Sequence, residues 1–134
     1  MKKNFKKLSS LDIFRGAKVL ITGHTGFKGS WLSTWMNHLG ADISGMSFDI
    51  PTTPSNFSVS FVDEFVNDHQ VDVGDTNKVK NLIAKIQPDF VFHLAAQALV
   101  RPSYENPVRT MITNAIGTAN VLDALKYLDK KVVV

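Results

Sequence analysis

One segment near the start of the chain constrains the fold more than any other. Residues 18–22 are an apolar run rich in β-branched side chains, and this run stops at Gly23. Gly26 and Gly29 follow at three-residue steps, and an apolar pattern of helical spacing then begins. This order of strand, glycine turn and helix points backbone N–H groups and the positive end of a helix dipole at one place, which suits a diphosphate. The segment therefore predicts a dinucleotide-binding βαβ unit.

Each glycine of the turn has its own expected role. Gly23 permits the tight turn, Gly26 lets the backbone approach the pyrophosphate, and Gly29 lets the helix pack close to the strand. We expect the His24 imidazole or the Lys28 ammonium group to face the diphosphate, although solvent exposure is an equally good interpretation of Lys28. The predicted cofactor-binding residues between these glycines are His24, Thr25, Phe27 and Lys28.

The rest of the chain alternates between strand and helix patterns. A doubly wound parallel sheet of the Rossmann type follows from this alternation. Residues 57–65 are ambiguous, because their aromatic residues keep helical spacing while β-branched residues are frequent. Loops are predicted at 50–56 and around the prolines between 100 and 107. The predicted strands are 18–22, 42–47, 66–71, 90–94 and 132–134, and the predicted helices are 27–39, about 75–86 and about 108–128.

Length and charge limit the number of domains and the classes of partner. A chain of 134 residues holds one domain at most. We assign residues 1–15 to a basic tail and 16–134 to the NAD-binding domain. The net charge is +3, and the tail alone holds four lysines, so the domain is close to neutral and nucleic-acid binding has little support. The chain has no cysteine and no long apolar run, which favours a cytoplasmic protein without disulfides or a membrane span.

The chain ends inside the apolar, β-branched run 132–134. A natural terminus seldom lies in a central strand, so we expect a truncated reading frame or gene product. On this interpretation the Rossmann domain is incomplete, ending in or just after the fifth strand, and the substrate domain is absent.

An acidic residue follows the second predicted strand. Asp49 lies twenty residues beyond Gly29, where a carboxylate accepts hydrogen bonds from the adenosine ribose and repels a 2′-phosphate. No arginine adjoins Asp49 in the sequence, so NAD is favoured over NADP. The alternative is an ordinary loop aspartate.

Two further strand ends contribute candidate cofactor residues. Asp72 and Val73 follow the third strand, where the carboxylate can accept from the adenine amino group; a turn or helix-capping role is an equal alternative. Small residues after the fourth strand leave room for a flat ligand in the crevice, with close packing as the alternative. This second segment is Leu94, Ala95 and Ala96.

Several polar residues beyond the glycine turn also need interpretation. Gln97 and Arg101 lie just past the predicted crevice and are candidate substrate residues, although Arg101 could equally pair with Glu105. His93 ends a buried strand and is expected to be a hydrogen-bonded core histidine. The four histidines show no metal-ligand spacing, so no metal site is expected.

These features together resemble the extended short-chain dehydrogenase/reductase superfamily, with its Gly-x-x-Gly-x-x-Gly turn and a fourth strand that ends in His-x-Ala-Ala. The resemblance runs from about residue 14 to the end. Within the superfamily, three segments are similar to CDP-glucose 4,6-dehydratases. They are Gly23–Leu32, Asp49 with the prolines that follow it, and Ala95–Tyr104; Asn114–Leu122 resembles the helix that follows the fourth strand across the superfamily.

The resemblance implies an enzyme that holds NAD tightly and acts on a nucleotide sugar, as a homodimer. It implies hydride removal from C4, loss of water across C5 and C6, and hydride return to C6. A Tyr-x-x-x-Lys pair beyond the fifth strand, with a Ser or Thr, does the proton chemistry in this superfamily, because the lysine lowers the tyrosine pKa.

Tyr127 and Lys131 have the spacing of that catalytic pair but precede the fifth strand. We therefore expect no catalytic residues in this chain and no activity from it alone. Two alternatives are a fragment of another extended reductase, such as a sugar-nucleotide epimerase, and a non-catalytic NAD-binding module.

Overall fold

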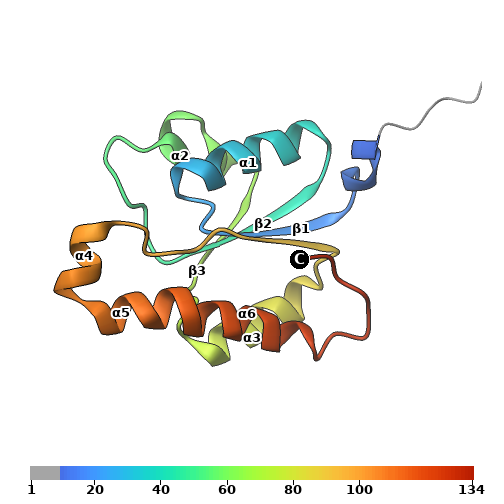
Figure 1. Ribbon diagram of the computed structural model, residues 1–134. Helices are drawn as coiled ribbons and strands as arrows, with labels where there is room; N and C mark the ends of the chain where they lie inside the picture. Colours follow the sequence, from blue (N-terminus) through green and yellow to red (C-terminus); the bar gives the residue numbers. More distant parts are fainter. Residues whose placement is uncertain (1–9) are drawn as a thin grey trace, which may run out of the picture.

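A computed structural model describes residues 10–134 as one parallel sheet between two layers of helices (Figure 1). The strand order is β3-β2-β1-β4, and all three pairings are parallel. This order reverses direction between β1 and β4, which is the switch point where doubly wound folds bind ligands. The strands are β1 (Lys18–Thr22), β2 (Asp42–Ser47), β3 (Asn67–Gln70) and β4 (Phe90–His93).

The helices divide between the two faces of the sheet. Helices α1 (Phe27–His38) and α2 (Asn56–Val59) lie on one face (Figure 1). The other face carries α3 (Thr76–Ile86) and the run made of α5 (Pro107–Met111), the π-helical turn η3 (Ile112–Ile116) and α6 (Gly117–Leu125). The short helix α4 (Val100–Glu105) and two 3-10 turns, η1 (Ser10–Phe14) and η2 (Val62–Glu64), complete the elements.

Alternating side chains of the strands fill two separate cores, as expected for a sheet covered on both faces. On the α3 and α6 side, Leu20, Met46 and Val91 pack with Val79 and Ile83. The core on the α1 side is formed by Val19, Ile21, Met36, Ile43, Phe57, Val62 and Val66. Strand β1 pairs with β2 on one side and with β4 on the other, and its residues point alternately into the two cores.

The predicted strands 18–22 and 42–47 and the start of the predicted helix at 27 agree with the structure. The α3 N-cap is also as expected, because the Asp75 side chain accepts a hydrogen bond of 3.1 Å from the Lys78 backbone N–H. The ambiguous segment 57–65 resolves into α2 and η2, both too short to show a helical repeat.

Three sequence predictions require correction. The loop predicted around Pro102 contains helix α4, which tolerates a proline near its N-terminus because the first helical N–H groups need no partner. The single helix predicted over 108–128 is interrupted by η3. The predicted strand 132–134 forms one parallel bridge, between Val133 and Phe90, rather than a strand.

The structure also describes the last residues of the segment that was assigned to the tail. Residues 10–14 form η1, and the Phe14 ring packs against Phe90 and Phe92, with centroid distances of 4.9 and 6.2 Å. The packed unit therefore includes residues assigned to the tail; the lysines of residues 1–9 lie outside the described residues.

Candidate cofactor-binding site

The glycine turn joins β1 to α1 at the switch point of the sheet. Gly23 has φ +71°, a conformation that favours glycine, and a Cβ atom there would lie 2.8 Å from the Ala95 backbone nitrogen. A Cβ atom on Gly29 would lie 2.1 Å from the Gly23 carbonyl oxygen. The predicted roles of these two glycines in the turn and in close packing are therefore confirmed.

Gly26 differs from Gly23 and Gly29, because its missing side chain provides open space rather than a special backbone conformation or close packing. Its φ of −73° suits any residue, and the Gly23 carbonyl oxygen, 3.3 Å away, is the one described atom that a Cβ would approach. Gly26 is the N-cap of α1, yet no side chain caps this helix and its first turn holds no acidic residue. The first N–H groups of α1 thus have no side-chain cap, and there is room for a group beside Gly26; this combination fits a diphosphate.

Around the helix start, the Phe27 side chain is 70% exposed and Lys28 is also exposed. An exposed ammonium group beside an uncapped helix N-terminus adds positive potential to the same place. Both of the interpretations given for Lys28 remain compatible with this position.

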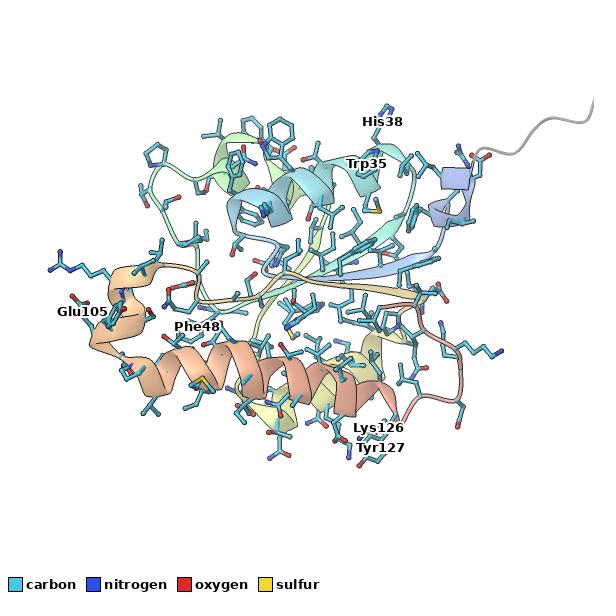
Figure 2. All side chains as sticks on the ribbon, viewed as in Figure 1. Trp35, His38, Phe48, Glu105, Lys126 and Tyr127 are labelled. Atoms are coloured by element: carbon cyan, nitrogen blue, oxygen red, sulfur yellow. The ribbon has the colours of Figure 1, made fainter. Side chains whose placement is uncertain are left out.

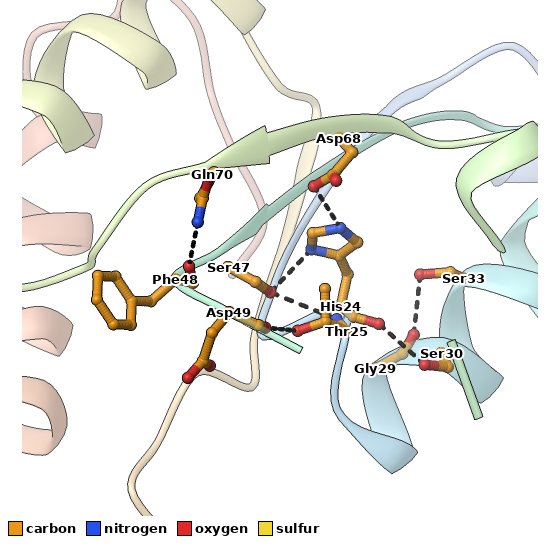
Figure 3. Close-up of polar contacts among 10 residues, drawn as sticks. All are labelled: His24, Thr25, Gly29, Ser30, Ser33, Ser47, Phe48, Asp49, Asp68 and Gln70. Carbon is orange, nitrogen blue, oxygen red and sulfur yellow. Dashed lines mark hydrogen bonds and ion pairs between the residues drawn. The ribbon is translucent and has the colours of Figure 1, made fainter. Parts of the chain in front are cut away.

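The position of the His24 side chain contradicts the prediction that its imidazole faces the diphosphate. Its side chain is fully buried, and the imidazole points into the protein, away from the space above the turn (Figure 3). Nδ1 lies 2.9 Å from the Ser47 hydroxyl, and Nε2 lies 2.9 Å from an Asp68 carboxylate oxygen. Burial lowers the pKa of His24, and the Asp68 carboxylate opposes this shift. The imidazole therefore does not face the diphosphate position.

Thr22 and His93 lock β1 to β4 beneath the crevice. The Thr22 hydroxyl accepts hydrogen bonds of 3.0 Å from the N–H groups of both Leu94 and Ala95, so its proton is donated to Nδ1 of His93, 2.7 Å away. Nε2 of His93 then donates to the Thr118 hydroxyl at 3.0 Å. The prediction of a hydrogen-bonded histidine is confirmed, and burial lowers the pKa of His93.

This use of Thr22 was missed in the sequence. A fully buried hydroxyl at the end of an apolar strand was the available signal, because buried hydroxyls require partners. The bonds hold the Leu94 and Ala95 backbone beside the glycine turn, where a Cβ on Gly23 would meet the Ala95 nitrogen, and Ala95 and Ala96 place two small side chains there.

Asp49 lies beyond the end of β2, next to the turn. The Thr25 hydroxyl donates a hydrogen bond of 2.6 Å to the Asp49 carbonyl oxygen, which ties the glycine turn to this segment. Figure 3 shows the Asp49 carboxylate directed away from this network. The residue is exposed, so its carboxylate is accessible for a ribose.

Asp72 already has partners on the protein. One carboxylate oxygen accepts from the Gly74 N–H at 2.8 Å, and the other lies 2.6 Å from an Arg109 guanidinium nitrogen. The structure thus shows the turn role that was the alternative for Asp72. The Val73 side chain is buried in the core and its carbonyl accepts a hydrogen bond of 2.8 Å from the Asn120 side chain, while the cofactor contact of Val73 stays a prediction.

Arg109 approaches the cofactor edge from a distant part of the sequence. Its guanidinium carbon lies 5.4 Å from the centroid of the Phe48 ring, and Phe48 adjoins Asp49. Figure 2 shows Phe48 between the sheet and the helix run of α5. The residues next to Asp49 in the sequence give no indication that Arg109 lies near it. Its charge is compensated by Asp72, so the argument against a 2′-phosphate is weakened but not reversed.

The two candidate substrate residues contact their own loop and helix. Gln97 donates from its side chain to the Leu99 carbonyl at 3.0 Å and to the Thr110 hydroxyl at 3.2 Å. Arg101 forms the ion pair with Glu105 that was its alternative, at 2.8 Å. Both residues follow β4, but neither is directed to the crevice by a contact with the glycine turn.

Tyr127 lies away from this site. Figure 2 shows it beside Lys126 at the C-terminal end of α6, at the end of the molecule opposite α4. The ring is 61% exposed and is covered by the Lys80 ammonium, 3.6 Å from its centroid. This position agrees with the expectation that Tyr127 is not catalytic.

Residues 10–134 contain no cluster of three or more His, Asp or Glu side chains placed to hold a metal ion. Over the same residues, no helix combines the length and the apolar character needed to cross a membrane.

His24, which is fully buried, and His93, which is half-buried, together predict a pH dependence of stability. Because burial lowers both folded-state pKa values, the unfolded chain takes up protons first as the pH falls below about 6.5. Stability should be constant above that pH and fall below it, by at most about 1.4 kcal/mol per pH unit for each histidine.

Urea unfolding between pH 7.5 and 5.5 measures this effect, because Asp75 and Asp89 have lowered pKa values and affect stability only in more acidic solution. His93→Gln should reduce the change in midpoint, and a variant of the exposed His38 should not. An unchanged midpoint in the unaltered chain would show that the histidines are not buried as neutral groups.

The fold and the site together define a class. A parallel 3-2-1-4 sheet, a three-glycine turn at its switch point and an uncapped helix N-terminus are the features of a Rossmann-type dinucleotide-binding domain.

Comparisons with known proteins place the chain within that class. A family profile described as GDP-mannose 4,6 dehydratase matches residues 20–134, and the chain belongs to this family of the extended short-chain dehydrogenases/reductases. It is 45% identical over 117 residues to CDP-glucose 4,6-dehydratase of Salmonella typhimurium, covering 87% of this chain and 33% of that protein. GDP-mannose 4,6-dehydratase of Yersinia enterocolitica is 34% identical over an alignment of 119 residues, which covers 81% of this chain and 31% of that protein.

A solved structure has the same fold. UDP-glucose 4-epimerase of Thermus thermophilus, in complex with NAD, matches with a TM-score of 0.71 and 29% identity, over 81% of this chain and 33% of that one. This chain therefore spans about a third of the length of the relatives it matches.

Proposed function

We propose that this chain is the NAD-binding N-terminal portion of a nucleotide-sugar 4,6-dehydratase that acts on CDP-glucose. The observation that carries the proposal is the open cradle at Gly26, where an uncapped helix N-terminus faces space that a side chain would fill. The 45% identity to a CDP-glucose 4,6-dehydratase favours that substrate over the epimerase alternative. The complete enzyme is proposed to be a cytoplasmic homodimeric lyase.

The residues of this chain would divide the work of holding NAD. The N–H groups at the start of α1 bind the diphosphate, and Lys28 adds positive charge beside them. The exposed Asp49 carboxylate accepts from the ribose hydroxyls. Leu94 and Ala95, whose N–H groups are held by the Thr22 hydroxyl, would border the path toward the nicotinamide together with Ala96. When bound, NAD would accept a hydride from C4 of the sugar and return it to C6.

A chimera tests this function. Residues 1–134 replace the matching third of the Salmonella typhimurium enzyme, so that the rest of that enzyme provides the remaining two thirds of its length. We expect the chimera to convert CDP-glucose to the 4-keto-6-deoxy product, detected by chromatography. A folded chimera that neither binds NAD nor forms product would refute the proposal, and the same chimera with Gly26→Val is the matched inactive control.

The isolated chain should form no product from CDP-glucose and NAD, because Tyr127 lies away from the crevice and no other tyrosine–lysine pair has the catalytic spacing. Tyr127→Phe should leave NAD affinity unchanged within about twofold, since it removes only a hydroxyl from a surface contact. Product formation by the isolated chain would show that the catalytic assignment is wrong. The error would lie at Tyr127 if Tyr127→Phe then abolished that product formation.

A further inference from the structure

The buried ring of His24 crosses one strand to reach another. It lies against Gly45 of β2, where an added Cβ would be 2.3 Å from the ring carbon Cδ2. In the sheet register, Gly45 pairs with Asp68 of β3. The ring therefore extends from the glycine turn across β2 to the Asp68 carboxylate, as Figure 3 shows. Only a glycine at position 45 leaves room for this path.

The hydrogen bonds of Ser47 determine how the network is connected. The Ser47 hydroxyl oxygen accepts from the Thr25 backbone N–H at 3.3 Å, so its proton is available to Nδ1 of His24 at 2.9 Å. This leaves Nε2 as the protonated nitrogen on the side of Asp68. The carboxylate is 2.9 Å from Nε2 but lies off the direction of the N–H, so that contact is electrostatic rather than a well-aligned hydrogen bond.

The same network continues to Asp49. Thr25, whose N–H is held by Ser47, donates from its hydroxyl to the Asp49 carbonyl at 2.6 Å. A chain of contacts thus runs from Asp68 through His24, Ser47 and Thr25 to the residue expected to bind the ribose. Of the residues before Asp49 in this network, His24, Ser47 and Thr25 are buried, whereas the Asp68 side chain is 48% exposed.

We propose that His24 is a positioning residue for the ribose end of the cofactor, acting through Ser47 and Thr25 on the placement of Asp49. This inference rests on the proposed NAD-binding function. The imidazole fixes the turn and the Asp49 segment relative to each other, so that the diphosphate and the ribose are met by groups already in place. Loss of these hydrogen bonds would leave the fold and the glycine turn intact but would weaken the binding of the cofactor's ribose.

The test is a double-mutant cycle on NAD affinity, measured by titration calorimetry on the full chain. Ser47→Ala removes the hydroxyl that joins His24 to Thr25, and Asp49→Ala removes the ribose acceptor. We expect Ser47→Ala to weaken NAD binding by about five- to tenfold and Asp49→Ala by about tenfold or more. In the double variant, Ser47→Ala should add less than about twofold, because the network then has no carboxylate to position.

Three further variants separate positioning from general stability. Ser44→Ala is the matched control, because Ser44 is a buried serine of the same strand whose hydroxyl has no hydrogen bond within residues 10–134. It should leave NAD affinity unchanged within about twofold. Ser47→Thr keeps the hydroxyl and should restore most of the affinity lost in Ser47→Ala. His24→Gln should lose affinity as Ser47→Ala does.

The inference is overturned if Ser47→Ala behaves like Ser44→Ala, or if the effects of Ser47→Ala and Asp49→Ala simply multiply. Either result with normal NAD binding by the unaltered chain leaves the proposed function standing. Absence of NAD binding by the unaltered, folded chain would overturn the proposed function and this inference together.

Discussion

Gly26→Val is expected to abolish NAD binding while the fold persists, with a loss of affinity of more than about 100-fold. The Gly26 backbone has a φ of −73°, which valine adopts without strain, and a Cβ would meet one carbonyl oxygen at 3.3 Å. The rest of the valine side chain must then occupy the space in front of the first N–H groups of α1. That space is where we place the diphosphate.

Gly26→Ala is the control for this prediction. A single methyl group fills less of the cradle, so the loss of affinity should be smaller, and the melting temperature of both variants should stay close to that of the unaltered chain. Calorimetric titration together with a thermal melt provides both measurements. Retained affinity in a folded Gly26→Val variant would mean that the diphosphate lies elsewhere.

Gly29→Ala is expected to destabilise the chain by at least about 3 kcal/mol, a large share of the roughly 5–15 kcal/mol by which an ordinary domain is stable. Its Cβ would lie 2.1 Å from the Gly23 carbonyl oxygen and 2.6 Å from the His24 Cα. Both contacts are with backbone atoms, so relief requires the turn to move. That movement would also disturb the buried His24 ring.

Urea unfolding gives this value directly, and Gly26→Ala is again the matched comparison, because it makes the same substitution in the same turn. We expect Gly26→Ala to cost less than about 1 kcal/mol. Equal midpoints for the two alanine variants would show that α1 does not pack against the turn as closely as described.

The framework of this fold could be predicted from sequence because its signals are local. The apolar run at 18–22 ends at glycines whose spacing specifies a turn, and Asp75 is an N-cap residue that indicates the start of α3. The strand order then follows from the alternation of strands and helices. Helix α4 was missed, because a segment with a proline and few apolar residues facing a core carries no helical repeat.

The site was harder to predict where its contacts join distant segments. His24 was placed by its neighbours in the turn, but the glycine at position 45 and the carboxylate at 68 decide where its ring lies. The arginine near Asp49 comes from position 109, which no local reading connects to it. By contrast, Gly23 and Gly29 act through backbone geometry within their own turn, so their roles could be predicted from spacing.

The central claim is that this chain binds NAD at the glycine turn and prefers it to NADP. Titration of the unaltered chain with each cofactor in turn tests this claim most directly. We predict one NAD bound per chain, with NADP bound at least about tenfold more weakly because the Asp49 carboxylate repels a 2′-phosphate while Asp72 compensates the charge of Arg109. Equal or tighter binding of NADP, or no binding of NAD by a chain that melts cooperatively, would contradict the account.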